Sequence, residues 1–370
     1  MERRWTMNYM KLRCHHYSFI MWLLILILCS ACEHRPLETP YPKENLFVKI
    51  YFDENIRNVN YGFYDETKKR PEYNSPQLMR IIFCDQESDK LITERYLHEC
   101  GVDEKGYYIQ GYVNVPNGRY NVMAYNFDTK YIKVENNGTY SNMVATTEYL
   151  TESEENRIFK SRGENANADE PIYRQPDHLF VSRIEDFEVN TCDIYNCSDT
   201  LKTAENKLPT AESIVKTYYM QFNVKGVEYV RSAVALISGM AASKNMHTGE
   251  MVMDHVASIY FGLNNGKENN LRTTDENKNT VAYASFNTFG KLPYTEGYID
   301  ITFEFNTVYN TVQTETFRVT DMFETDEVKE KQWIIIDKII EIVPPEGADI
   351  GGGMSPGVSE WKEIEGSITI

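Results

Sequence analysis

Residues 298–308 read YIDITFEFNTV, and this stretch decides the fold class. Apolar and polar side chains alternate along it with the two-residue period of a β-strand. One face would carry Ile299, Ile301, Phe303 and Phe305, and the other Asp300, Thr302, Glu304 and Asn306. The chain contains 26 Tyr among its 370 residues and many Thr, Val and Ile, which favour strands over helices. The sequence therefore predicts an all-β protein.

Further strand signals occur on both sides of this stretch. They cover residues 46–52, 78–84, 107–115, 119–126, 179–183, 218–230, 259–263, 281–289 and 333–343. Residues 116–118 (PNG) predict a tight turn, and Thr320-Asp321 can cap one short helix that ends near Lys331. The alternating segment at 361–370 follows a glycine run and is expected to complete a sheet, in its own domain or in a partner.

The length and the distribution of charge predict two domains. A chain of 370 residues suits two domains of roughly 100–200 residues each. Residues 151–176 are charged and lack apolar periodicity, which is typical of a linker or a long exposed loop. We therefore expect an N-terminal β-sandwich domain at residues 46–150 and a C-terminal one at residues 177–370. The Pro-rich residues 32–45 would form a tether before them.

The N-terminus has the pattern of a secretory signal. A basic stretch through Arg13 precedes an uncharged apolar core at residues 19–28, which is shorter than the roughly 20 residues of a membrane span. Cys29-Ser30-Ala31 then leads to Cys32, and this resembles a bacterial lipobox. We expect residues 1–31 to be removed and Cys32 to carry the lipid. The alternative is an ordinary signal in which Cys32 is a chance thiol, and Met1, Met7 or Met10 could be the start.

Charge and cysteine usage limit the partners. The net charge is -17, and residues 1–31 carry four basic residues and one acidic, so the mature body is at -20. Such a body is repelled by phosphate backbones, which argues against nucleic acid as a partner. Beyond Cys32 lie Cys84, Cys100, Cys192 and Cys197. Disulfides 84–100 and 192–197 are the simplest pairing in an exported protein, free buried thiols are the alternative, and zinc would need tighter spacing.

The catalytic sequence patterns in the chain are incomplete or are common by chance. Gly353-Met-Ser355-Pro-Gly357 matches the nucleophile elbow G-x-S-x-G, but Pro356 has no N–H for an oxyanion hole. Residues 213–216 and 359–362 fit S-x-x-K, a pattern that is common by chance. His247 and His255 do not have the i, i+4 spacing of two metal ligands on one helix. We predict a protein that is not an enzyme and that uses no cofactor or metal.

Four stretches resemble fimbrillin-like lipoproteins of Gram-negative anaerobes, which are related to the anchor and assembly subunits of minor fimbriae. They are residues 32–37 (CEHRPL), 115–126 (VPNGRYNVMAYN), 235–240 (ALISGM), and 351–353 together with 358–361 (VSEW). The resemblance implies two tandem transthyretin-like β-sandwich domains. It also implies an outer-membrane lipid anchor with palmitate, a surface location, and a role in fimbrium assembly or cell adhesion.

The resemblance further implies a mode of assembly. Subunits of this type polymerise by strand exchange, and polymerising members lose an N-terminal strand to a protease. Here the strand at residues 46–52 follows Cys32 closely, so cleavage behind it would also remove the anchor. We expect an anchor or accessory subunit whose partners are other fimbrial subunits. The alternative is a surface glycan-binding lipoprotein of a nutrient-uptake system, in which the abundant Tyr and Trp form a sugar platform.

Overall fold

The structure is a computed structural model that describes residues 43–53, 74–159, 170–189, 208–254, 256–263, 280–293 and 299–345. The prediction of an all-β fold is confirmed, because strands form nearly all of the regular structure in these ranges. The two α-helices among them are short: α2 covers Glu152–Ile158 and α5 covers Asp326–Lys331. In the part of the chain that the structure describes, no helix has the length and apolarity of a membrane span.

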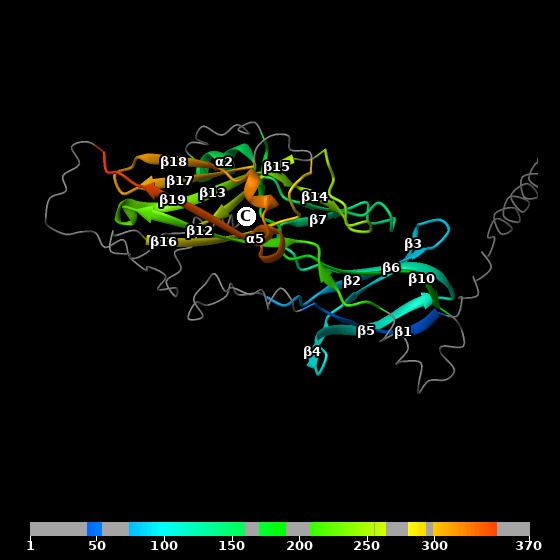
Figure 1. Cartoon of the computed structure of the whole chain (residues 1–370). Coiled ribbons are helices and arrows are strands. Elements are labelled where there is room, and N and C mark those ends of the chain that lie inside the picture. The colour runs from blue at the N-terminus through cyan, green and yellow to red at the C-terminus, as the bar shows by residue number, and fades with distance from the viewer. Residues whose placement is uncertain are drawn as a thin grey trace, which may run out of the picture. The chain divides into compact units, whose positions relative to one another are not determined.

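The first sandwich contains a three-stranded sheet in the order β1-β5-β4 and a five-stranded sheet in the order β11-β10-β6-β2-β3. The strands are β1 (Lys43–Tyr51), β2 (Met79–Asp85), β3 (Leu91–Leu97), β4 (Glu99–Asp103), β5 (Gly106–Pro116), β6 (Gly118–Asn126), β10 (Phe180–Val189) and β11 (Glu212–Ser213). Alternate residues of both sheets meet in one core, which includes Ile50, Phe83, Val113, Val122 and Phe180. Figure 1 shows β1 and β5 in one layer and β6 and β10 in the other.

The second sandwich has the same pair of sheet sizes, in the orders β16-β12-β19 and β18-β17-β13-β15-β9. Its strands are β9 (Ile172–Arg174), β12 (Lys216–Lys225), β13 (Val230–Ala241), β15 (Val256–Gly262), β16 (Thr280–Thr288), β17 (Asp300–Thr307), β18 (Val312–Arg318) and β19 (Trp333–Glu341). The inward residues of β12, β16 and β19 pack on those of β13, β15 and β17. The interior contains several aromatic rings, among them Phe222 and Phe303 at 4.7 Å between centroids.

A fifth sheet, in the order β14-β8-β7, joins β7 (Ile132–Glu135), β8 (Val144–Thr147) and β14 (Ser243–Asn245). It contributes to a separate apolar cluster, in which Ile82 and Tyr125 from the outward faces of β2 and β6 pack with Ala145. Phe289 and Leu292, which follow β16, complete this cluster. Apolar packing therefore continues on the outer side of the five-stranded sheet.

Most predicted strands are present within a residue or two of their predicted bounds, but the strand at 218–230 is interrupted. The chain leaves β12 at Gly226, whose φ is +83°, and a Cβ there would lie 2.2 Å from the carbonyl oxygen of Ile342. A short 3₁₀ helix at Val227–Tyr229 follows, and β13 then begins a strand of its own. The sequence prediction merged two elements because the glycine was not treated as a break.

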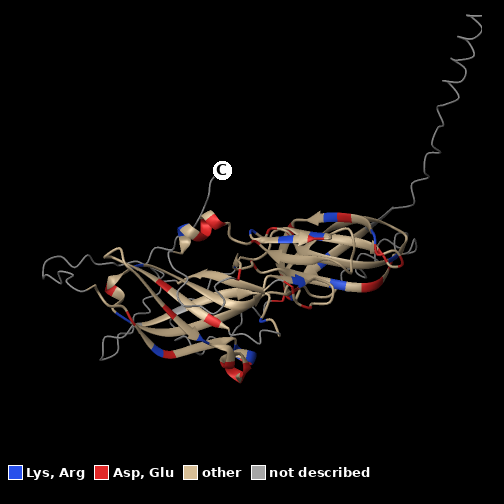
Figure 2. Cartoon of the chain, turned by 90° about the horizontal axis from the view of Figure 1, so that it is seen from above, with Lys and Arg blue, Asp and Glu red and all other residues tan. Residues whose placement is uncertain are grey.

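The strand pairing also differs from the predicted domain ranges, 46–150 and 177–370. Apart from this difference, the domain ranges stay a prediction. β10 pairs with β6 and β11 pairs with β10, so both belong to the first sandwich although they lie within residues 177–370. The range 151–176 is not uniformly exposed loop, since it contains α2 and β9. Ile158 is buried against Val234 and Leu236 of β13. Acidic and basic residues are interspersed over the described strands, as Figure 2 shows.

Candidate functional site

The first candidate site is β1, whose inner face is part of the core. Val48 and Ile50 are fully buried, as the alternation of residues 46–52 predicts. Phe52, directly after the strand, lies 5.4 Å from Phe180 and 5.6 Å from Tyr107 between ring centroids. Burying a side chain of this size contributes about 1.5–3 kcal/mol relative to exposure. The inner face alone therefore ties β1 strongly to the sandwich.

The outer face of β1 is held as well. The ammonium of Lys49 lies 2.6 Å from Oδ2 of Asp103 on β4, and the hydroxyl of Tyr51 donates to the same oxygen at 2.9 Å. Because β5 lies between β1 and β4, these contacts pass across the middle strand. Lys49 crosses it directly over the ring of Tyr108, 3.8 Å from the centroid. We call Lys49, Tyr51, Asp103 and Tyr108 the outer clamp.

In the outer clamp, the ionised carboxylate of Asp103 is held by hydrogen-bond donors. The Lys49 ammonium, with the N–H of Lys105 and the Tyr51 hydroxyl, lowers the pKa of Asp103 to about 2. Burial raises the pKa of Tyr51, so its hydroxyl stays protonated at neutral pH and can donate. Next to the clamp, Phe47 contacts Tyr112 at 5.2 Å between centroids. Both faces of β1 therefore have specific partners.

The second candidate site is β19, at one end of the sheet β16-β12-β19. It pairs in parallel with β12, and its inward residues Ile334, Ile336 and Ile340 are buried. Its outward side chains are exposed: 37% for Ile335 and 51% for Ile339. Among the described ranges, no strand pairs with its far edge. The same face also carries Glu341, which pairs with Lys225 of β12 at 2.6 Å, so exposed aliphatic and charged side chains alternate on it.

The predicted site residues lie apart from these strands or outside the described residues. Cys84 is buried in β2 and Cys100 is exposed in β4, and the structure has both as free thiols, which is the alternative to an 84–100 disulfide. Burial raises the pKa of the Cys84 thiol to about 12. Several predicted residues and segments lie outside the described ranges: Cys32, where the lipid is expected, the pair Cys192 and Cys197, the segment 353–357 and the C-terminal segment 361–370.

The described residues contain no group of three or more His, Cys, Asp or Glu that could hold a metal ion. His247 contacts Tyr140 at 4.8 Å between rings and lies 3.6 Å from a carboxylate oxygen of Glu185. Its partner in the sequence pattern, His255, is outside the described residues. Ser213 accepts from the N–H of Val215 at the end of β11, where it supports a turn.

Sequence reasoning missed the outer clamp. Its four residues come from three strands, and only the register of the sheet brings them together. One signal was present: Gly101, opposite Tyr108, has no side chain, and a Cβ there would lie 2.4 Å from the Tyr108 hydroxyl oxygen. A glycine inside a strand often marks such a close approach.

Comparison with known proteins gives a family and several relatives. A family model described as a domain of unknown function, DUF5119, matches residues 66–262, just over half of the chain. The chain is 24% identical to the "Putative fimbrium anchoring subunit Fim4B" of Bacteroides ovatus, over 93% of this chain and 95% of that protein.

Two solved structures are also similar. One is a crystal structure of a "putative adhesin" from Bacteroides ovatus, at 22% identity and a TM-score of 0.49, which covers 85% of this chain and 98% of the other. The second is the fimbrial anchor protein Mfa2 from Porphyromonas gingivalis, at 8% identity and a TM-score of 0.40, which covers 80% of this chain and 90% of the other.

Proposed function

The chain belongs to the DUF5119 family, and on that premise we propose that it is a fimbrial anchor or accessory subunit, held at the outer membrane by a lipid on Cys32. The observation that carries the proposal is the similarity to Fim4B, which extends over almost the full length of both chains. The proposed role is in fimbrium assembly and cell adhesion at the cell surface, and it is non-catalytic.

The arrangement of β1 supports an anchor more than a repeating subunit. In strand exchange, an extended segment of one subunit completes the open sheet of the next. β1 starts at Lys43, a short distance after Cys32, and its inner face is part of the core. If the chain keeps this strand, the position stays filled and no donor segment can enter there. A lipid on Cys32 would then connect the filled sandwich directly to the membrane.

The experiment uses the full-length gene in its host. Cys32→Ala is expected to abolish labelling with radioactive palmitate and to release the protein from the membrane fraction. Cys100→Ala is the matched control, because Cys100 is exposed and its removal leaves the signal intact. A Cys32→Ala protein that remains labelled would contradict the lipid anchor.

A gene deletion tests the assembly role separately. Electron microscopy of the deletion strain is expected to show surface filaments that are lost, lengthened or shed into the medium. Filaments of unchanged number, length and attachment would contradict the fimbrial role, whatever the result of palmitate labelling.

A further inference from the structure

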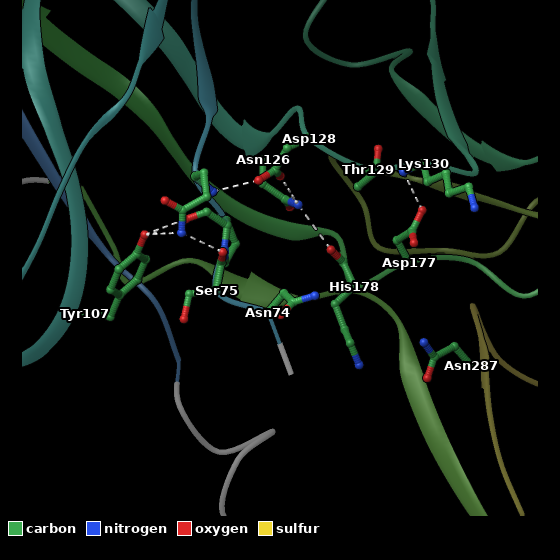
Figure 3. A pocket seen from close by; sticks show the side chains of 12 residues that line it. Asn74, Ser75, Tyr107, Asn126, Asp128, Thr129, Lys130, Asp177, His178 and Asn287 are labelled. Carbon is green, nitrogen blue, oxygen red and sulfur yellow. Dashed lines mark hydrogen bonds between the residues drawn. The ribbon is translucent and has the colours of Figure 1, made fainter. Parts of the chain in front are cut away.

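A cavity of about 710 Å³ lies beside the end of β6. It is lined by residues within 74–77, 126–130 and 177–178, together with Tyr107 and Asn287. Figure 3 shows amide, carboxylate and hydroxyl groups around it. The volume falls in the range of roughly 300–1,000 Å³ that is typical of small-molecule sites.

Part of the cavity lining is fixed by hydrogen bonds to the carboxylates of Asp128 and Asp177. Asp128 accepts from the N–H of Gln77 at 2.6 Å and from the amide of Asn126 at 3.1 Å. Oδ2 of Asp177 accepts from the N–H of Lys130 at 2.7 Å and of Tyr131 at 2.6 Å. Polar groups held this way are already positioned for a ligand, which lowers the entropic cost of binding.

Other lining side chains already have hydrogen-bond partners within the protein. Burial lowers the pKa of His178 to about 4, so the ring is neutral, and its two nitrogens each lie 3.3 Å from a hydroxyl, of Ser213 and of Thr217. The amide of Asn287 bonds to Thr217 and to the carbonyl of Pro176. These side chains shape the cavity and are not arranged as an acid or a base.

Two groups keep hydrogen-bonding capacity. Oδ1 of Asp177 and the exposed amide of Asn74 have no hydrogen-bond partner among the described residues. A carboxylate can accept about four hydrogen bonds, so Asp128 also has capacity left. The site thus calls for a ligand that donates several hydrogen bonds.

Charge and shape narrow the ligand class. The lining holds two carboxylates against one ammonium, that of Lys130, so phosphate and other anions are repelled. The ring of Tyr107, whose hydroxyl donates to the carbonyl of Pro76 at 2.6 Å, offers an apolar surface beside the polar groups. We propose that this cavity binds a neutral saccharide, whose hydroxyls donate to Asp128 and Asp177 and bond to the amide of Asn74. This proposal does not depend on the fimbrial role.

Saturation-transfer NMR on the full chain, in a detergent without a sugar head group, tests the proposal. The probes are glucose, galactose, mannose and N-acetylglucosamine, with N-acetylneuraminic acid as an anion and spermidine as a cation. We expect signals from at least one neutral sugar and none from the two charged probes. Signals from spermidine alone, or from no neutral sugar, would overturn the proposal.

Two variants of Asn74 place the binding in the cavity. Asn74→Ala removes one hydrogen-bonding group and is expected to weaken binding about 3- to 10-fold. Asn74→Trp places a large side chain in the cavity lining and is expected to abolish binding. Asn114→Ala is the control, since Asn114 is an exposed residue of β5 outside the cavity, and it should bind as the natural chain does. Sugar binding that Asn74→Trp leaves unchanged would show that the site lies elsewhere and overturn the proposal.

Discussion

β1 and β19 occupy equivalent positions and differ on one face. Each lies at one end of a three-stranded sheet, and each buries alternate residues in the core of its sandwich. On the outer face of β1, Lys49 and Tyr51 are bound to Asp103. On the outer face of β19, Glu341 pairs with Lys225 of the adjacent β12, but Ile335 and Ile339 are exposed to solvent.

The difference indicates opposite roles. A strand with contacts on both faces gives up more stabilising interactions when it leaves the sheet. We therefore expect β1 to remain in its sheet. Exposed aliphatic side chains on an end strand gain free energy if another segment covers them or pairs with the edge. β19 is therefore the better position for an added segment, from this chain or from a partner.

The largest effect is expected from removing the C-terminal segment 361–370, which we predict completes a sheet. Residues 361–370 alternate, with Ile364, Ile368 and Ile370 on one face, and each would contribute about 1.5–3 kcal/mol if buried. Truncation after Gly357 is expected to lower the melting temperature of the protein if the segment pairs within its own chain. If it pairs with a partner, the truncated protein should melt as before and fail to join fimbriae.

Calorimetry and immunogold microscopy measure the two outcomes. The control replaces residues 358–370 by a Gly/Ser segment of equal length, which keeps the chain length and removes the apolar face. It should behave as the truncation does. Unchanged melting together with unchanged incorporation into fimbriae would contradict a sheet-completing role.

The strands themselves could be predicted, but their partners could not. Alternation marks a strand locally, and residues 179–183 were identified in this way. Nothing in that alternation reveals that β10 pairs with β6, more than 50 residues earlier in the chain. Pairing is set by the packing of whole faces, so the predicted boundary at residue 177 divided the first sandwich.

The strand at 298–308 shows a second limit. The alternation assigns Asp300, Thr302 and Glu304 to a separate polar face, and the structure shows that these residues are almost fully buried as well. Their neighbours on β18 provide polar partners: the guanidinium of Arg318 lies 3.5 Å from Asp300, and the hydroxyls of Thr302 and Thr316 lie 3.1 Å apart. The period of two tells the faces apart but does not tell which of them is covered.

The helix α2 could have been predicted from its start. Residues 151–154 read TESE, which has the S/T-x-x-E pattern of a capping box, and the N–H of Thr151 donates to Glu154 at 3.0 Å. The residues that line the cavity could not have been predicted from the sequence. They come from segments that are distant in sequence, and none of these segments forms a motif by itself.

A smaller effect is expected from replacing one isoleucine by alanine in β1 or in β19. Ile50→Ala in β1 removes a fully buried side chain and is expected to cost about 2–5 kcal/mol of unfolding free energy. Ile339→Ala in β19 removes a side chain that is 51% exposed and should change stability by about 0.5 kcal/mol or less. Urea unfolding of the full chain measures both. Equal losses would mean that the outer face of β19 is covered in solution.

The smallest expected effect concerns the outer clamp and its dependence on pH. Asp103→Asn removes the charge that Lys49 pairs with, and Glu324→Gln is a matched control in the second sandwich. Lys291 and Lys329 lower the pKa of Glu324 to about 2, as Lys49 does for Asp103. Both carboxylates are solvent-accessible, so each pair contributes little to global stability. The local effect should differ, because only Asp103 holds β1.

The lowered pKa of Asp103 determines in which direction pH changes the stability of β1. A carboxyl group with a folded pKa of about 2 and an ordinary value of 3.8 stabilises the folded state above pH 4 and loses that contribution as the pH falls towards 2. Hydrogen exchange of the β1 amides should therefore speed up in the natural chain between pH 4 and pH 2, beyond the change in intrinsic rate. In Asp103→Asn, these amides should exchange up to about fivefold faster at neutral pH, with no further loss of protection in the acid range. Glu324→Gln should leave β1 exchange unchanged throughout. If both variants affect β1 equally, or neither does, the strand is held by its inner face alone.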